Sequence, residues 1–168
     1  SLTFNGTNTF AGSDEWLEVN GTDAKFTVTL NDPSLDVHKT SGLIAGVGNV
    51  YYNTFDYALA QAKSTQEEDA VNILETVILS ADQTIDFENI AVTSTVNPAF
   101  RITDGATVTV ENGNMDTGGV AYNFILGASD GTSAVPPTTF LISCRPVVTR
   151  PPSQLVFNVL IGSSTPYW

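Results

Sequence analysis

Few residues of this chain could perform acid–base chemistry, and histidine, the side chain most often used for it, occurs once. His38 lies in the polar stretch Asp36-Val37-His38-Lys39. A Ser-His-Asp triad could form only through this histidine. Because its neighbours are polar and charged, we predict that His38 is an ordinary surface residue.

Paired carboxylates are the stronger catalytic candidates, since glycosidases place two of them at a defined distance. Asp86 and Asp104 lie 18 residues apart by subtraction, and Glu88 and Arg101 lie between them. In a repetitive fold, Asp86 and Arg101 could project from neighbouring turns. Acidic residues outnumber basic ones threefold, 18 to 6, so some alignments of this kind are expected by chance. We therefore predict a surface ion pair between Asp86 and Arg101, and no catalysis.

The sequence offers little for metals or redox chemistry. The segment Asn112-Gly113-Asn114-Met115-Asp116 carries three oxygen-bearing side chains at alternate positions, but no downstream glutamate completes a Ca²⁺ loop. This favours a turn over a calcium site. Cys144 is the single cysteine, so it can form no internal disulfide or cysteine-based zinc site and is predicted to be a buried apolar residue. No cofactor is expected, with Ca²⁺ the weak alternative.

Aromatic side chains could bind sugars by stacking, although most are expected in the core because they bury large areas. The candidates are Trp16, Tyr51, Tyr52, Tyr57, Tyr122, Tyr167 and Trp168. The pair Tyr167-Trp168 is the exception, and we expect it to enter a pocket on this chain or on another.

Composition narrows the classes of partner. The 168 residues carry a net charge of −12, and the six basic residues are scattered along the chain. Binding to nucleic acid requires a basic stripe and docking on an anionic membrane requires a basic cluster, so neither is expected. No stretch of about 18 apolar residues predicts a membrane-spanning helix. A polar surface poor in lysine is typical of exported or particle-surface β-proteins.

The elements that would position these residues are mostly strands. Six apolar positions recur at spacings of 17, 18, 17, 17 and 17 residues by subtraction, which is typical of a solenoid. They are Ile73, Ile90, Val108, Ile125, Ile142 and Val159. Residues 1–40 read as short strands with turns at Asn5-Gly6 and Asn20-Gly21, packed on the main body. One helix is predicted from Thr54, its N-cap, to Lys63, with Phe55, Leu59 and Ala62 on one face.

Four segments resemble a known family. The run 50–62 with 70–74 and 84–87, and the segment Gly105–Gly113, are similar to pectate-lyase-like parallel β-helix domains of bacterial and archaeal surface proteins and of phage fibres and spikes. The resemblance covers about residues 50–143. It implies a fold and no single function, because that fold carries lyases, hydrolases, adhesins and inert spikes. The family's coil is roughly 20–25 residues, longer than 17, which leaves irregular coils or a β-sandwich open.

Residues 144–168 depart from the repeat. Arg145-Pro146 and Arg150-Pro151-Pro152 favour an extended path, and a strongly apolar strand follows. Such a strand must be covered, either by closing the last coil or by crossing to a neighbouring subunit. The predicted interface residues are Leu155, Val156, Phe157, Val159, Leu160, Tyr167 and Trp168.

The sequence thus predicts a mostly β protein, a short parallel β-helix-like solenoid with one capping helix, or alternatively a β-sandwich or jelly roll. Its parts are an N-terminal strand cap (1–40), the body (41–143) and a proline-led arm (144–168). The expected function is that of a non-catalytic structural subunit that assembles or decorates a phage particle, fibre or extracellular surface array. Its partners would be copies of itself or another structural protein, and its location a virion or cell surface. The alternatives are a carbohydrate-binding adhesin module and a polysaccharide lyase or hydrolase.

Overall fold

The computed structural model describes residues 1–11, 14–21, 24–65, 69–119 and 122–127, together with the backbone of 140–143. Within these ranges the chain is mostly β-sheet with one short α-helix, which confirms the predicted class. The elements, in chain order, are β1 (Leu2–Phe4), β2 (Leu17–Glu18), β3 (Thr27–Leu30), η1 (Val37–Lys39), β4 (Thr40–Ser41), β5 (Ala45–Val47), β6 (Val50–Tyr52), α1 (Phe55–Thr65), β7 (Val71–Ile73), β8 (Val77–Leu79), β9 (Gln83–Asp86), β10 (Ala91–Ser94), β11 (Phe100–Ile102), β12 (Val108–Glu111), β13 (Asn114–Asp116), β14 (Phe124–Leu126) and β15 (Phe140–Ser143).

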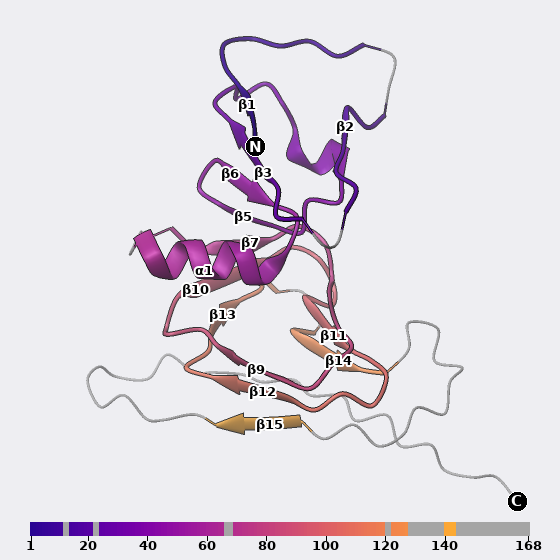
Figure 1. Cartoon of the computed structure of the whole chain (residues 1–168), viewed down its shortest axis with the longest axis vertical. Helices are drawn as coiled ribbons and strands as arrows, with labels where there is room; N and C mark the ends of the chain where they lie inside the picture. The colour runs from indigo at the N-terminus through magenta and orange to yellow at the C-terminus, as the bar shows by residue number, and fades with distance from the viewer. Residues whose placement is uncertain (12–13, 22–23, 66–68, 120–121, 128–139, 144–168) are drawn as a thin grey trace, which may run out of the picture.

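One seven-stranded sheet joins the N-terminal strands to the body of the molecule. Its strand order is β1-β3-β6-β5-β7-β10-β13, and Figure 1 shows it descending from β1 at one end towards β13. The pairs β1–β3, β7–β10 and β10–β13 are parallel, whereas β3–β6, β6–β5 and β5–β7 are antiparallel. The first forty residues therefore contribute two strands, β1 and β3, to the same sheet as the body.

From β7 onward the strands form three columns, each a row of parallel strands paired side by side. The columns are β7-β10-β13, β8-β11-β14 and β9-β12-β15. The chain visits the columns in the same order each time. Paired residues lie 21 positions apart for Val71 and Val92, 23 for Val77 and Phe100, and 24 for Phe100 and Phe124, by subtraction. The offset is 25 between β9 and β12 and rises to 32 between β12 and β15, by the same subtraction.

These offsets show that the predicted spacing of 17 residues is wrong. Ile73 pairs with Ser94 in the first column, whereas Ile125 lies in the second column, in β14, and Val108 in the third, in β12. Each time the chain runs through the three columns, it forms three short apolar strands. Apolar residues therefore recur at shorter intervals than the 21 to 25 residues that separate paired strands. Val159, the last of the six predicted positions, lies outside the described residues.

The main hydrophobic core contains buried side chains from all three columns, from β5 and β6, and from α1. Buried and exposed positions alternate along the strands, as in β12, where Val108 and Val110 are buried and Thr109 is only partly so. Four phenylalanine rings meet inside, in contacts whose centroids lie 5.0–6.3 Å apart. They are Phe55, Phe87, Phe100 and Phe124. Phe100 is 0% exposed and contacts the other three, so it stands at the centre of the core.

Helix α1 begins and ends close to its predicted bounds. The backbone N–H of Tyr57 donates to the Thr54 hydroxyl at 3.3 Å, which makes Thr54 the N-cap as predicted. Phe55, Leu59 and Ala62 are buried on one face, also as predicted. Through Phe55 the helix reaches the core rings, and Figure 1 shows it lying across the molecule beside β5, β7 and β10.

A second, smaller core covers the opposite face of the sheet. Its buried members are Val28, Leu30 and Leu43, and Tyr51 packs against them. The Tyr51 ring also leaves no room for a side chain at position 46, because a Cβ at Gly46 would lie 2.7 Å from it. Tyr52, the next residue along β6, points instead into the main core. Alternation along one strand thus places two neighbouring tyrosines in two different cores.

Candidate interaction surfaces

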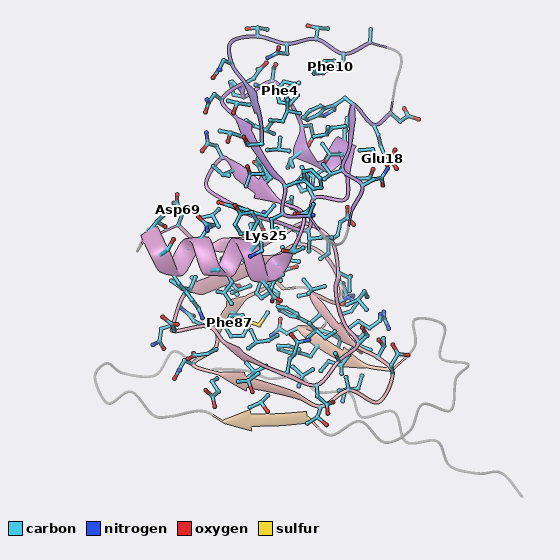
Figure 2. All side chains as sticks on the ribbon, viewed as in Figure 1. Phe4, Phe10, Glu18, Lys25, Asp69 and Phe87 are labelled. Atoms are coloured by element: carbon cyan, nitrogen blue, oxygen red, sulfur yellow. The ribbon has the colours of Figure 1, made fainter. Side chains whose placement is uncertain are left out.

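An aromatic cluster lies at the end of the molecule that carries β1. The Phe10 and Trp16 rings stack with centroids 5.5 Å apart and an interplanar angle of 7°, and Phe4 meets both edge-on. Phe10 is 47% exposed and Leu2 of the edge strand β1 is 43% exposed. Figure 2 shows Phe10 above Phe4, away from the main hydrophobic core that contains Phe87. An exposed aromatic group of this kind is suited to stacking or apolar contact.

Hydrogen bonds hold this cluster in place. Trp16 Nε1 donates to the carbonyl oxygen of Asp36 at 2.9 Å. The Asn8 side-chain amide donates to Asp32 at 2.9 Å, which ties the loop before Phe10 to the turn after β3. An asparagine row continues across the sheet ends, with Asn49 donating to Asn31 at 2.6 Å and Asn31 to Asn5 at 2.8 Å.

Asp32 is the most perturbed acid of the described residues. Its side chain is 2% exposed and accepts hydrogen bonds from the Ser34 hydroxyl at 2.6 Å, the Ser34 N–H at 3.0 Å, and the backbone and side chain of Asn8. These donors, led by the Ser34 hydroxyl, lower the pKa of Asp32 to about 2 although burial opposes the shift. Asp32 therefore acts as a charged anchor for the N-terminal loops.

The outward face of the column β8-β11-β14 carries a second surface. Ile78, Arg101 and Ile125 are register partners, and Ile78 is 56% exposed. Arg101 Nη1 donates to the Gly127 carbonyl oxygen at 3.4 Å, and the described residues place no carboxylate within ion-pair distance of it. This face is a short apolar row interrupted by one cation.

The predicted ion pair between Asp86 and Arg101 is wrong, because the two residues lie in different columns. Asp86 is the register partner of Glu111, and Arg101 that of Ile78. Asp86 accepts hydrogen bonds from the Asn112 amide at 2.8 Å and the Glu88 N–H at 2.9 Å, which with nearby Lys63 lower its pKa.

The remaining charged candidates make separate local contacts. The one ion pair within the described ranges joins Lys63 of α1 to Glu88 at 3.1 Å. Asp104 has a positive φ of 55° in a turn with Gly105, as that dipeptide predicts. His38 is exposed in η1, and its backbone N–H donates to the Asp36 carboxylate. The structure thus assembles no pair from the predicted catalytic residues that it describes.

The oxygen-rich segment Asn112–Asp116 combines a turn with a strand. Asn112 has a positive φ of 49°, which confirms the predicted turn, and its amide is engaged with Asp86. Asn114 and Asp116 lie in β13, and Asp116 accepts from the Gly118 N–H at 2.9 Å. Among the described residues no group of three or more His, Cys, Asp or Glu side chains could hold a metal ion. Within the same residues, no helix has the length and apolarity needed to cross a bilayer.

The aromatic candidates divide between core and surface. Tyr52 is buried, Tyr51 is partly buried with its pKa raised by burial, and Tyr57 lies beneath Lys25, whose Nζ is 5.1 Å from the ring centroid. Trp16 lies in the N-terminal cluster, whereas its partners Phe4 and Phe10 were not predicted. The only sequence feature that points to Phe4 and Phe10 is that they are aromatic residues within a polar segment. The predicted interface residues Leu155, Val156, Phe157, Val159, Leu160, Tyr167 and Trp168 lie outside the described residues, as does Cys144.

One further sequence motif of the kind found in hydrolases was not among the predicted sites. Gly127-Ala128-Ser129-Asp130-Gly131 has the Gly-x-Ser-x-Gly spacing of a nucleophile elbow, which requires a strand, a sharp turn and a helix. β14 ends at Leu126 directly before it, and Ser129 itself lies outside the described residues. The spacing alone assigns no role to this serine.

Comparison with known proteins adds no relative to this description. No family model, no curated protein and no solved structure matches the chain.

Proposed function

We propose that this chain is a non-catalytic structural subunit that assembles or decorates a phage particle, a fibre or an extracellular surface array, and that it associates with copies of itself through residues 144–168. The observation that carries the proposal is the arrangement of parallel strands in three columns, which the chain visits in constant order. A repetitive body of this kind provides a long, stiff surface.

We also propose that the three columns form the sides of a short parallel β-helix-like solenoid, with α1 against its first coil. Its support is the inward alternation of apolar residues and the offsets of 21 to 25 residues by subtraction, which agree with the roughly 20–25 that the family resemblance implies. The longer offset of 32 between β12 and β15 would make the proposed third coil longer than the others.

A structural function is favoured by how the charged groups are distributed. Asp86 and Arg101, the best catalytic candidates, lie in separate columns. The acidic balance of 18 to 6 gives a solvated, self-repelling surface, so association must depend on local apolar contacts. The densest apolar run outside the described residues is Leu155–Ile161.

The test is the absolute mass of the full chain by light scattering over a concentration series. We expect a trimer or a larger assembly, and we expect Leu160→Ser in the full chain to shift it towards monomer. A shortened chain of residues 1–145 should be monomeric, with its circular dichroism recorded to show that it keeps its sheet. Wild-type protein that stays monomeric at all concentrations would contradict the proposal.

A second function, a carbohydrate-binding adhesin module, is favoured by the aromatic cluster of Phe4, Phe10 and Trp16. Sugars stack on exposed aromatic faces, and Phe10 is 47% exposed. This function predicts a monomer that is retained by a glycan on an array and loses that retention with Phe10→Ala. Equal retention of the variant and the wild type would remove this cluster as the binding site.

A further inference from the structure

Strand β1 leaves one edge of the seven-stranded sheet open within the described residues. It is the first strand in the order β1-β3-β6-β5-β7-β10-β13, and Figure 1 places it at the end of the molecule away from β12. The Phe4 carbonyl oxygen accepts from the Asn31 N–H at 3.0 Å, on the side of β3. Backbone groups of neighbouring residues in a strand point to opposite edges, so the N–H and C=O of Thr3 point away from β3. No described residue pairs with them.

The same edge exposes apolar side chains. Of the three large hydrophobic side chains that are exposed in the described part of the chain, Leu2 at 43% and Phe10 at 47% lie here. Leu2 and Phe4 face the same side of the sheet, because side chains alternate along a strand. Phe4 meets the Phe10 and Trp16 rings edge-on, so Leu2 lies on the sheet face that carries the aromatic cluster. An open edge with exposed apolar side chains is suited to pairing with another strand.

Charge favours a second copy of the chain as the occupant of this edge. The net charge of −12 makes two copies repel one another. Residues 1–13 contain no charged side chain, and β1 has neither lysine nor proline, which natural edge strands use against pairing. The end strand β9 differs, because Asp82 precedes it and Asp86 belongs to it. The β1 edge is therefore a place where two acidic copies can meet with little local repulsion.

The edge is also complementary to itself. If two β1 strands pair antiparallel about a two-fold axis that passes between their Thr3 residues, perpendicular to the sheet, the two threonines exchange N–H···O=C bonds as a hydrogen-bonded pair. In this register Leu2 lies opposite the partner's Phe4. The exposed leucine of each copy then packs against the aromatic cluster of the other. Such a contact uses the same surface on both copies and closes on itself, as in most homodimers.

We infer that β1 binds the β1 of a second copy in this register, so that one sheet continues through both chains. A strand of three residues offers a small contact, and interfaces below about 1,000 Å² are weak or transient. The contact therefore forms at high protein concentration, or between assemblies in which several weak contacts act together. It is separate from the proposed association through residues 144–168 and does not depend on it. Residues 1–145 stay monomeric in dilute solution for the same reason.

Disulfide trapping tests this pairing in the full chain, with Cys144→Ser as the background. Thr3 is exposed, and a hydrogen-bonded antiparallel pair places the two Cα atoms about 5.5 Å apart, within the range of about 4.4–6.8 Å that a disulfide spans. Oxidised glutathione accepts the two electrons released when the two thiols join. We expect Thr3→Cys to give a covalent dimer, seen by electrophoresis without reductant, and to form it faster at higher protein concentration.

Thr84→Cys in the same background is the matched control. Thr84 is also an exposed threonine of an end strand, but it lies in β9 between two acidic residues. Its chain should cross-link much more slowly than the Thr3→Cys chain. Equal rates for the two chains would show that the β1 edge does not select a second copy, and would overturn the inference.

A charge placed on the edge gives a second readout. Leu2→Glu added to Thr3→Cys should slow cross-linking by about tenfold, since the contact contains Leu2 twice and each copy loses the burial of an apolar side chain. Ile78→Glu makes the same change of charge at a side chain that is 56% exposed in another sheet, and should leave the rate nearly unchanged. Equal slowing by both changes would mean that net charge alone governs the rate, and the pairing would be wrong.

These measurements separate the β1 contact from the proposed function. A wild type that is monomeric by light scattering, together with fast cross-linking of the Thr3→Cys chain, would refute association through residues 144–168 and support the β1 contact. An oligomeric wild type whose Thr3→Cys and Thr84→Cys chains cross-link equally would support the proposed function and refute the β1 contact.

Discussion

The two hydrophobic cores lie on opposite faces of one sheet, and they are stabilised in different ways. The main hydrophobic core is a continuous set of buried aliphatic and aromatic side chains around Phe100. The N-terminal core has three buried members and relies on polar anchors around it. Two of these anchors are buried, Asp32 and Asn53.

Asn53 shows how such an anchor works. Its side-chain oxygen accepts from the Phe26 N–H at 2.8 Å, and its amide donates to the carbonyl oxygens of Gly21 at 3.0 Å and Ala24 at 2.8 Å. A buried polar side chain with all these partners satisfied fixes a loop that has few apolar contacts of its own. Side-chain hydrogen bonds therefore position the short strands of the N-terminal region, whereas apolar packing positions the strands of the columns.

The largest predicted effect is in the main core. Phe100→Ala removes a ring that is 0% exposed and that contacts three other phenylalanines. We expect it to lower the free energy of unfolding by about 3–5 kcal/mol, the usual cost of removing a buried aromatic side chain. Denaturant unfolding followed by circular dichroism measures this. A loss as small as that for the exposed Phe10 would contradict the central place assigned to Phe100.

An intermediate loss of stability is expected from changing the polar anchor Asp32. Asp32→Asn keeps the shape of the side chain but replaces an acceptor oxygen with a donor, so it should lower the melting temperature by a few degrees at pH 7. Because the pKa of Asp32 is lowered from 3.8 to about 2 in the folded state, its contribution is present above pH 3.8 and is lost as the pH falls towards 2. The difference between variant and wild type should therefore shrink over that range.

The control for Asp32 is Asp14→Asn, which changes the same charge at an exposed position of the same region. Its melting temperature should follow the wild type at every pH. A constant difference between Asp32→Asn and the wild type from pH 7 to pH 2 would show that the ionised carboxylate is not the anchor.

The smallest effect is expected at the surface. Phe10→Ala removes a ring that is 47% exposed and that contacts Trp16 by stacking and Phe4 edge-on. We expect less than about 1.5 kcal/mol, the value of an aromatic pair beyond its buried area. Thermal unfolding measures it, and a loss comparable to that of Phe100→Ala would remove the contrast between the two regions.

The sequence alone determined the local features of this protein. The N-cap Thr54, the buried face of α1 and the turns at Asp104-Gly105 and Asn112-Gly113 were predictable, because each depends on neighbours within a few residues. The mostly β class followed from the abundance of alternating apolar runs.

Only the tertiary structure decided which strands are neighbours. Asp86 and Arg101 were expected together, yet Asp86 pairs with Glu111, since register depends on the length of every connection between strands. The same reason explains the failure of the 17-residue spacing, because Ile73, Val108 and Ile125 lie in three different columns. The cluster of Phe4, Phe10 and Trp16 also forms only when a loop folds back over β1, a contact that no local pattern encodes.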